Sequence, residues 1–198
     1  MSRRIIIRNN YFFYIIAWLF LGHICGLLLS VLLFNQINPY YYKQLNKITQ
    51  EIGEIERGDC IFIQSCFFYR MKEWMLLILF SGLASYFIMY FIYFFFKGAM
   101  GGMLLGILLQ NFGIKGIGFG LVFYFPQEIF YLFIEVVTVL FMIARKNEKC
   151  KVTWKRRSMM GGISIGIFIS LLCILLGAYL EGTVNTSLIK WFIQQYNM

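Results

Sequence analysis

Long apolar segments, separated by short polar ones, dominate this sequence of 198 residues. A helix needs about 20 mainly apolar residues to cross the hydrocarbon core of a bilayer, so runs of about 18 or more predict spans. The apolar runs cover 11–34, 74–96, 98–112, 117–143 and 159–181. The pattern predicts an all-α integral membrane protein, a five-helix transmembrane bundle in a single membrane domain over 1–198.

The composition supports a membrane location. Hydrophobic residues make up 60% of the chain and charged residues 14%, against about a quarter in a typical soluble domain. A soluble fold of this length could not bury so much apolar surface.

The segment 98–112 is the shortest predicted span and is rich in glycine. It offers only about 15 residues where about 20 are usual. A tilted short helix and a re-entrant segment both fit this length. The full span is favoured because it preserves the distribution of charge described below.

The N-terminal segment has features of a secretory signal peptide, because Arg3, Arg4 and Arg8 precede an apolar run. The apolar region of a signal peptide covers about 7–15 residues and ends at small residues. The run at 11–34 is longer, and no A-x-A cleavage site follows it. We therefore expect an uncleaved first span.

Basic residues gather in the polar segments in a way that predicts orientation. With a cytoplasmic N-terminus, the inner segments contain eleven basic residues and one acid, Glu148. The basic residues are Arg3, Arg4, Arg8, Lys97, Arg145, Lys146, Lys149, Lys151, Lys155, Arg156 and Arg157. Lys and Arg are retained on the cytoplasmic side, so the bias favours an inner N-terminus and an outer C-terminus.

The predicted outer segments carry mixed charge. Their basic residues are Lys43, Lys47, Arg57, Arg70, Lys72, Lys115 and Lys190, and their acids are Glu51, Glu54, Glu56, Asp59 and Glu73, with Glu181 at the border. The net charge of +9 thus reflects topology, and no nucleic-acid partner is expected. Anionic lipid headgroups are the nearest partner of the basic loop at 145–157.

The first extracytoplasmic segment, 35–73, has a helical pattern of its own. Leu45, Ile48, Ile52 and Ile55 fall at helical spacing, and an apolar, aromatic stretch covers 61–71. We expect short amphipathic helices on the outer membrane surface. A solvated loop with chance periodicity is the alternative.

The cysteines and the single histidine predict no metal site and no cofactor. The chain has five cysteines, no CxxC pair, and only His23 as a histidine. These residues do not complete a familiar zinc site. A disulfide between Cys60 and Cys66 can form if their segment is extracytoplasmic, and the sequence does not decide whether it does.

Glycines at four-residue spacing recur in the predicted spans. The pairs or triplets are Gly22 and Gly26, then Gly98, Gly102 and Gly106, and finally Gly162 and Gly166. This spacing lets two helix backbones approach closely. Internal packing of the bundle is the favoured interpretation, and a homo-oligomer interface is the alternative.

Acidic residues inside predicted spans are the second polar feature. Glu128 and Glu135 lie seven residues apart on one helix face, and Glu181 ends the last span. A charge at mid-bilayer costs about 3 kcal/mol or more, so these groups need partners. The partners expected from the sequence are His23, Gln110, Gln127 and the helix end that Pro126 frees by removing a backbone hydrogen bond.

Two roles fit these acids. One is a buried polar network, including Pro126, Gln127 and Glu181, that fixes helix register; the other is a proton or ion path through Glu128 and Glu135. The structural role is favoured because no paired basic residue is evident in the other predicted spans. No enzyme is predicted, since GxSxG, HExxH and P-loop signatures are absent from the sequence.

Several short motifs, in order and over essentially the whole chain, resemble the stage II sporulation protein M family. They are Phe96-Lys97-Gly98 through Gly106, Asn111 through Gly116, Phe125-Pro126-Gln127, Tyr179-Leu180-Glu181 and Ser187 through Trp191. Wider family members often carry Pro-His-Gly and a downstream Glu, whereas this chain has the Pro-Gln form of the sporulation branch.

The resemblance implies a membrane scaffold needed for forespore engulfment and septal peptidoglycan thinning. It implies a multi-pass protein of the bacterial cell membrane, in the mother-cell septal or engulfing membrane, which anchors two peptidoglycan hydrolases, stage II sporulation proteins D and P. The aromatic residues of the first outer segment and its border are expected either to contact these partners or to lie at the membrane interface. They are Tyr40, Tyr41, Tyr42, Phe67, Phe68 and Trp74. A transporter or channel component that uses Glu128 and Glu135 is the alternative function.

Overall fold

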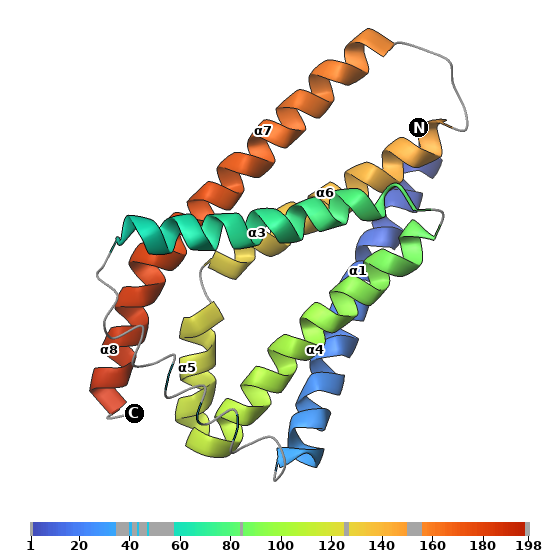
Figure 1. Cartoon of the computed structure of the whole chain (residues 1–198). Coiled ribbons are helices and arrows are strands. Elements are labelled where there is room, and N and C mark those ends of the chain that lie inside the picture. Colours follow the sequence, from blue (N-terminus) through green and yellow to red (C-terminus); the bar gives the residue numbers. More distant parts are fainter. Residues whose placement is uncertain are drawn as a thin grey trace.

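The computed structural model describes residues 2–34, 40, 43, 47, 58–83, 85–124, 127–149 and 156–196. Every element in this part of the chain is helical (Figure 1). The elements are α1 (Ser2–Leu32), α3 (Cys60–Phe80), α4 (Tyr86–Phe112), α5 (Ile114–Tyr124), α6 (Gln127–Lys149), α7 (Arg156–Leu180), the π-helical turn η1 (Glu181–Asn185) and α8 (Thr186–Tyr196).

Length and composition identify three helical segments that could each cross a membrane: Tyr11–Leu32, Tyr86–Phe112 and Gly166–Trp191. A fourth span results if Ile114–Val122 and Gln127–Ile143, which meet at 61°, form one bent span. The structure is thus all-helical with three to four candidate spans, compatible with a multi-pass membrane protein.

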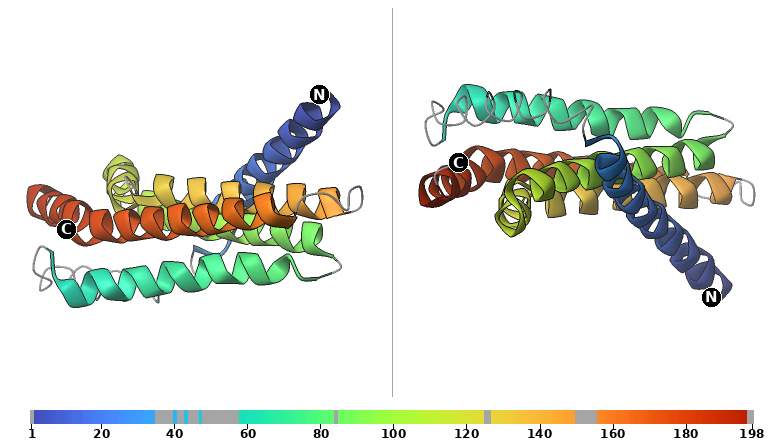
Figure 2. Two further views of the ribbon diagram at one scale, coloured as in Figure 1. Left: turned by 90° about the horizontal axis from the view of Figure 1, so that it is seen from above. Right: turned by 90° about the horizontal axis from the view of Figure 1, so that it is seen from below.

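The helices form three layers (Figure 2). α4, α6 and α7 lie together in the middle layer, α3 lies against one side of it, and α1 crosses the opposite side. One core cluster forms where Ile15, Leu77 and Phe94 meet beside Val139. A second joins Trp74 of α3 to Ile134 and Ile174.

α1 and α4 are the most closely packed helix pair, and they run in the same direction. Aromatic pairs between the two helices follow the same order along both helices. The ring centroids of Tyr11 and Phe87 are 5.2 Å apart, and farther along those of Trp18 and Phe95 are 5.9 Å apart. Gly22 and Gly26 of α1 face the backbone of α4 farther along.

The helix boundaries differ from those expected near Lys97. The sequence predicted one span at 74–96 and another at 98–112, but α4 continues through Lys97 without a break. The chain reverses earlier, after Phe80, where the Ser81 hydroxyl donates to the carbonyl of Ile78 at 2.6 Å. Hydropathy did not locate this turn, because the segment 81–85 is short, carries no charge and lies between two apolar runs.

The last part of the outer segment also differs. The stretch 61–71 was expected to form a separate surface helix, but it continues into one helix, α3, through Lys72, Glu73 and Trp74. Asp59 begins α3 by accepting the backbone N–H of Ile61 at 2.9 Å. The predicted amphipathic helix over 45–55 lies outside the described residues.

Candidate functional site

Six charged side chains from four elements meet between the middle layer and α3, and we call them the ionic cluster. The ionic cluster comprises Arg70 and Glu73 of α3, Lys97 of α4, Glu128 and Glu135 of α6, and Glu181 of η1. Four of these side chains are acids and two are bases.

Lys97 joins α4 to α6. Its Nζ lies 2.6 Å from Glu135 Oε1 and 3.1 Å from Glu128 Oε1. The two acids are seven residues apart, which places them two helical turns apart on one face of α6. One ammonium group therefore contacts both acids of that face.

Arg70 joins α3 to α6 and η1. Its guanidinium nitrogens lie 3.1 Å from Glu73 Oε2, 3.3 Å from Glu128 Oε2 and 3.9 Å from Glu181 Oε2. The guanidinium carbon also lies 4.4 Å from the centre of the Tyr131 ring, a cation–π distance. Glu128 thus contacts both bases, so the six side chains form one connected network.

Two tyrosine hydroxyls complete the network. Tyr93 donates to Glu135 Oε1 at 3.1 Å, and Tyr131 donates to Glu181 Oε2 at 3.0 Å. The Glu135 side chain is 4% exposed, and its Oε2 accepts no hydrogen bond within the described part of the chain. This oxygen is a buried acceptor without a donor, which is energetically costly.

One member of the cluster, Lys97, lies near the middle of its helix. Lys97 is eleven residues from the start of α4 and fifteen from its end. At 1.5 Å per residue these separations are roughly 16 and 22 Å. In a span with a hydrocarbon core of about 30 Å, the ammonium group lies near mid-bilayer.

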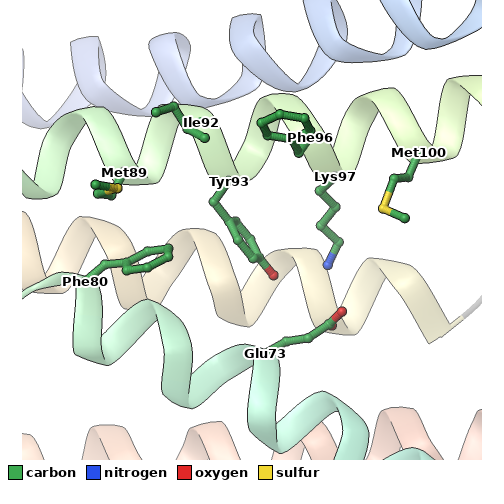
Figure 3. A pocket seen from close by; sticks show the side chains of 8 residues that line it. All are labelled: Glu73, Phe80, Met89, Ile92, Tyr93, Phe96, Lys97 and Met100. Atoms are coloured by element: carbon green, nitrogen blue, oxygen red, sulfur yellow. The ribbon is translucent and has the colours of Figure 1, made fainter.

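A groove between α3 and α4 reaches the cluster (Figure 3). It has a cavity volume of about 280 Å³. The side chains of Glu73, Tyr93 and Lys97 extend toward one another in it. Its remaining lining is apolar and comprises Phe80, Met89, Ile92, Phe96 and Met100. The groove is therefore mainly apolar, and three polar side chains converge in it.

The partners of the glutamates differ from those expected. His23 bonds the carbonyl of Leu19 at 3.0 Å on its own helix, and Gln110 donates to Ser30 at 3.4 Å. The true partners, Lys97 and Arg70, were placed in inner and outer segments by the sequence analysis. The other predicted spans offered no basic partner for these acids because Lys97 and Arg70 were placed outside those spans.

The sequence carries a signal for one of these bases. Lys97 is a lone charge between two apolar runs, a position that also fits the end of a span. As part of one helix over 86–112, it lies about three turns from one end and about four turns from the other. A lone base at that depth requires an acidic partner.

The glycines of α1 and α4 lie at one interface. A Cβ added at Gly22 or Gly26 would overlap backbone atoms of Phe95 or Ala99. At Gly98 and Gly102 it would overlap the backbone of α1, and at Gly106 the hydroxyl of Ser30. These five glycines serve packing within the chain.

The glycines of α7 have different surroundings. Gly166 has no atom within 4 Å of an added Cβ. Gly162 lies in α7, but its surroundings are outside the described residues. Of this pair, only Gly166 can be assessed, and it lies at no close helix contact with the described residues.

The aromatic residues expected to contact partners are not a single exposed surface. Trp74 is 6% exposed and donates from Nε1 to Thr138 Oγ1 at 3.0 Å, so it is a core residue. Phe67 packs against the core cluster of Trp74. Phe68 and Tyr40 are exposed, whereas Tyr41 and Tyr42 lie outside the described residues.

The other predicted polar residues have clear positions where they are described. Gln127 is buried at the start of α6, and Glu181 begins η1. Pro126 lies outside the described residues. Cys60 and Cys66 are both free thiols on α3, so no disulfide joins them.

The described residues contain no group of three or more His, Cys, Asp or Glu side chains arranged to hold a metal ion. The cluster can bind a cation or a proton, because its carboxylates outnumber its basic groups.

Comparison of the chain with protein-family models, with curated proteins and with solved structures gives no match.

Proposed function

We propose that the chain has five spans, α1, α3, α4, the bent pair α5–α6, and α7, with an inner N-terminus and an outer C-terminus. The parallel packing of α1 and α4 supports this topology. Two parallel spans begin on the same side, so the chain between them must return across the membrane. In this topology α3 makes that return.

The short reversal between α3 and α4 supports the same topology. It places the end of α3 and the start of α4 on one side, which is also the side where α1 starts. Two of the three charges of α3, Arg70 and Glu73, belong to the ionic cluster, and the third, Lys72, has a long side chain that can extend toward the membrane surface. The basic segment that links α6 to α7 then lies inside, as the positive-inside rule requires.

The function we propose for this membrane protein is the one that the family resemblance implies. It is a non-enzymatic scaffold that anchors the peptidoglycan hydrolases, stage II sporulation proteins D and P, at the septal membrane during forespore engulfment. The observation that supports a scaffold is that the ionic cluster ties four elements into one unit, including η1 on the outer side.

A fixed outer surface is what such a scaffold needs. The backbone N–H of Gly58 donates to the carbonyl of Gly182 at 3.2 Å, which joins the start of α3 to η1. Ile63 packs directly against Gly182. The ends of α3 and α7 therefore hold each other, and the neighbouring α8 extends this surface.

The test is co-purification. The tagged full-length chain is solubilised in mild detergent from sporulating cells, and the captured proteins are identified. Recovery of wall hydrolases is the expected result. A tagged, unrelated five-span protein expressed at the same level is the control. Recovery of no wall hydrolase, with the chain folded and abundant, contradicts the scaffold role.

A second candidate function is ion or proton transport through Glu128 and Glu135. The specific observation in its favour is the excess of acids over bases in the ionic cluster, beside a groove that Glu73 and Lys97 line. Replacing both Glu128 and Glu135 by Gln separates the two functions. A scaffold keeps its partners, whereas a transporter loses flux in proteoliposomes while it stays folded.

A further inference from the structure

The ionic cluster contains more negative than positive charge. Lys97 contacts two acids and Arg70 contacts three, with Glu128 common to both. Two bases neutralise two of the four carboxylates. A buried carboxylate without compensation is costly, and proteins usually resolve that cost by protonating it.

Glu135 is the carboxylate best placed to carry a proton. Its side chain is 4% exposed, against 13% for Glu128, 21% for Glu181 and 26% for Glu73. Both donors to Glu135, Lys97 Nζ and Tyr93 Oη, contact Oε1. No donor in the described part of the chain reaches the buried Oε2, so one of the two oxygens that share the charge of Glu135 has no hydrogen bond.

Lys97 does not depend on Glu135 for an ionic partner. When Glu135 is neutral, the ammonium group still lies 3.1 Å from Glu128. When Glu135 is ionised, the same ammonium lies 2.6 Å from it. The arrangement therefore accommodates both protonation states of Glu135 without leaving a buried ammonium alone.

We propose that the ionic cluster is a proton-binding site in which Glu135 Oε2 holds an exchangeable proton while Lys97 stays charged. The site takes a proton from water and releases it to water, with no other reactant. The groups that face it come from every adjoining element: Arg70 and Glu73 of α3, Tyr93 and Lys97 of α4, Glu128 and Tyr131 of α6, and Glu181 of η1.

The groove offers the entry point for this proton. Tyr93 lines the groove and donates its hydroxyl proton to Glu135. A phenol both donates and accepts a hydrogen bond, so its oxygen can take up a proton from the groove while its own proton passes to Glu135 Oε1. Rotation of the carboxyl group then exchanges Oε1 and Oε2. The inference deepens the transport candidate without requiring it, because a site can hold a proton that never crosses the membrane.

Infrared spectroscopy of the full-length chain in lipid nanodiscs at neutral pH tests the proposal directly. The expected result is a carbonyl stretching band of a protonated carboxyl group that shifts in D₂O and disappears in Glu135→Gln. Asp59→Asn is the matched control, because Asp59 is an acid of α3's N-terminus outside the cluster and Asn keeps the cap, so the band stays. Absence of the band, or its persistence in Glu135→Gln, overturns the proposal.

A second measurement needs no variant and covers the case in which Glu135→Gln fails to fold. Solid-state NMR of the unsubstituted chain, labelled with ¹³C at the glutamate carboxyl carbon, distinguishes neutral from ionised groups. At least one neutral carboxyl at neutral pH is expected, and none overturns the proposal. The spectrum is recorded in sodium chloride and in choline chloride, and loss of the neutral signal in sodium alone assigns the site to a metal cation instead.

Discussion

Lys97 shows how one residue links several parts of this molecule. It lies at the centre of an otherwise apolar helix, and its ammonium contacts two acids of a neighbouring helix. A charged group at this depth is tolerated only with partners. The side chain therefore determines how α4 and α6 align along their axes.

Replacing Lys97 by Met should destabilise the folded protein by about 3 kcal/mol, because it leaves acids of the cluster without their base. Reversible unfolding in detergent micelles measures this loss. Lys72→Met, at an exposed position of α3, is the control and should change stability by less than about 0.5 kcal/mol. Equal losses of stability in the two variants would show that the buried ion pairs of Lys97 do not stabilise the folded protein.

Trp74 allows a structural role to be separated from a partner contact. The side chain is 6% exposed, and its indole N–H donates to Thr138. Trp74→Phe should cost about 1–3 kcal/mol of stability, because the buried threonine hydroxyl loses its donor. Capture of partners by the folded variant should be unchanged.

The control is Trp18→Phe on α1, where the indole is 40% exposed and the loss of stability should be smaller. Stability is measured as for Lys97, and partner capture by co-purification. Lost capture with full stability in Trp74→Phe would restore the contact role that the sequence suggested.

At the scale of elements, the parallel α1–α4 pair depends on residues without side chains. The carbonyl oxygen of His23 occupies the place where a Cβ at Gly102 would lie. Backbone cannot move aside as a flexible side chain can, so the helices would have to separate. Close backbone contact of this kind is how membrane helices associate without a hydrophobic driving force between them.

Gly102→Ala should therefore lower stability by about 1–3 kcal/mol, the usual cost of overpacking. Gly166→Ala is the matched control, since the same methyl group meets no atom within 4 Å. Alanine also favours helix over glycine, so the control should be neutral or slightly stabilising. Both are compared by thermal unfolding in one detergent. A Gly102→Ala protein as stable as the control would contradict this packing.

Helix content and membrane character could be predicted from the sequence, but not where every helix begins. The spans at 11–34 and 159–181 stand out because their polar flanks are clear. The turn after Phe80 does not, since Ser81 and Gly82 lie within apolar sequence. Periodicity identifies the apolar faces of helices, but a short turn of uncharged residues does not interrupt the apolar run in which it lies.

The candidate site was only half predictable for a related reason. Glu128 and Glu135 could be identified as buried acids because they interrupt an apolar run. Their bases were harder to assign, because Lys97 also fits the end of a span and Arg70 lies in a mixed polar and aromatic stretch that also fits a surface helix. Only the packing of α3 against α6 makes Arg70 part of the same cluster.

At the scale of the whole molecule, the position of α3 decides the topology. The five-span arrangement requires that α3 crosses the membrane, so that its two ends lie on opposite sides. A four-span arrangement would leave both ends on one side. Cys60, an exposed free thiol at the start of α3, and Leu83, which is 45% exposed after its end, are the natural reporters.

The test uses a chain in which every cysteine except Cys60 is replaced by Ser, and a second in which Cys60 is also replaced and Leu83→Cys is introduced. A membrane-impermeant maleimide added to intact cells should label the first chain, because its thiol is outside. The second should react only after the membrane is permeabilised, because its thiol is inside. Labelling of both thiols in intact cells would place α3 on the outer surface. Because α1 and α4 are parallel, another segment between them would then have to cross the membrane. The ionic cluster, which includes Arg70 and Glu73 of α3, would then lie at the membrane surface and not within the bilayer.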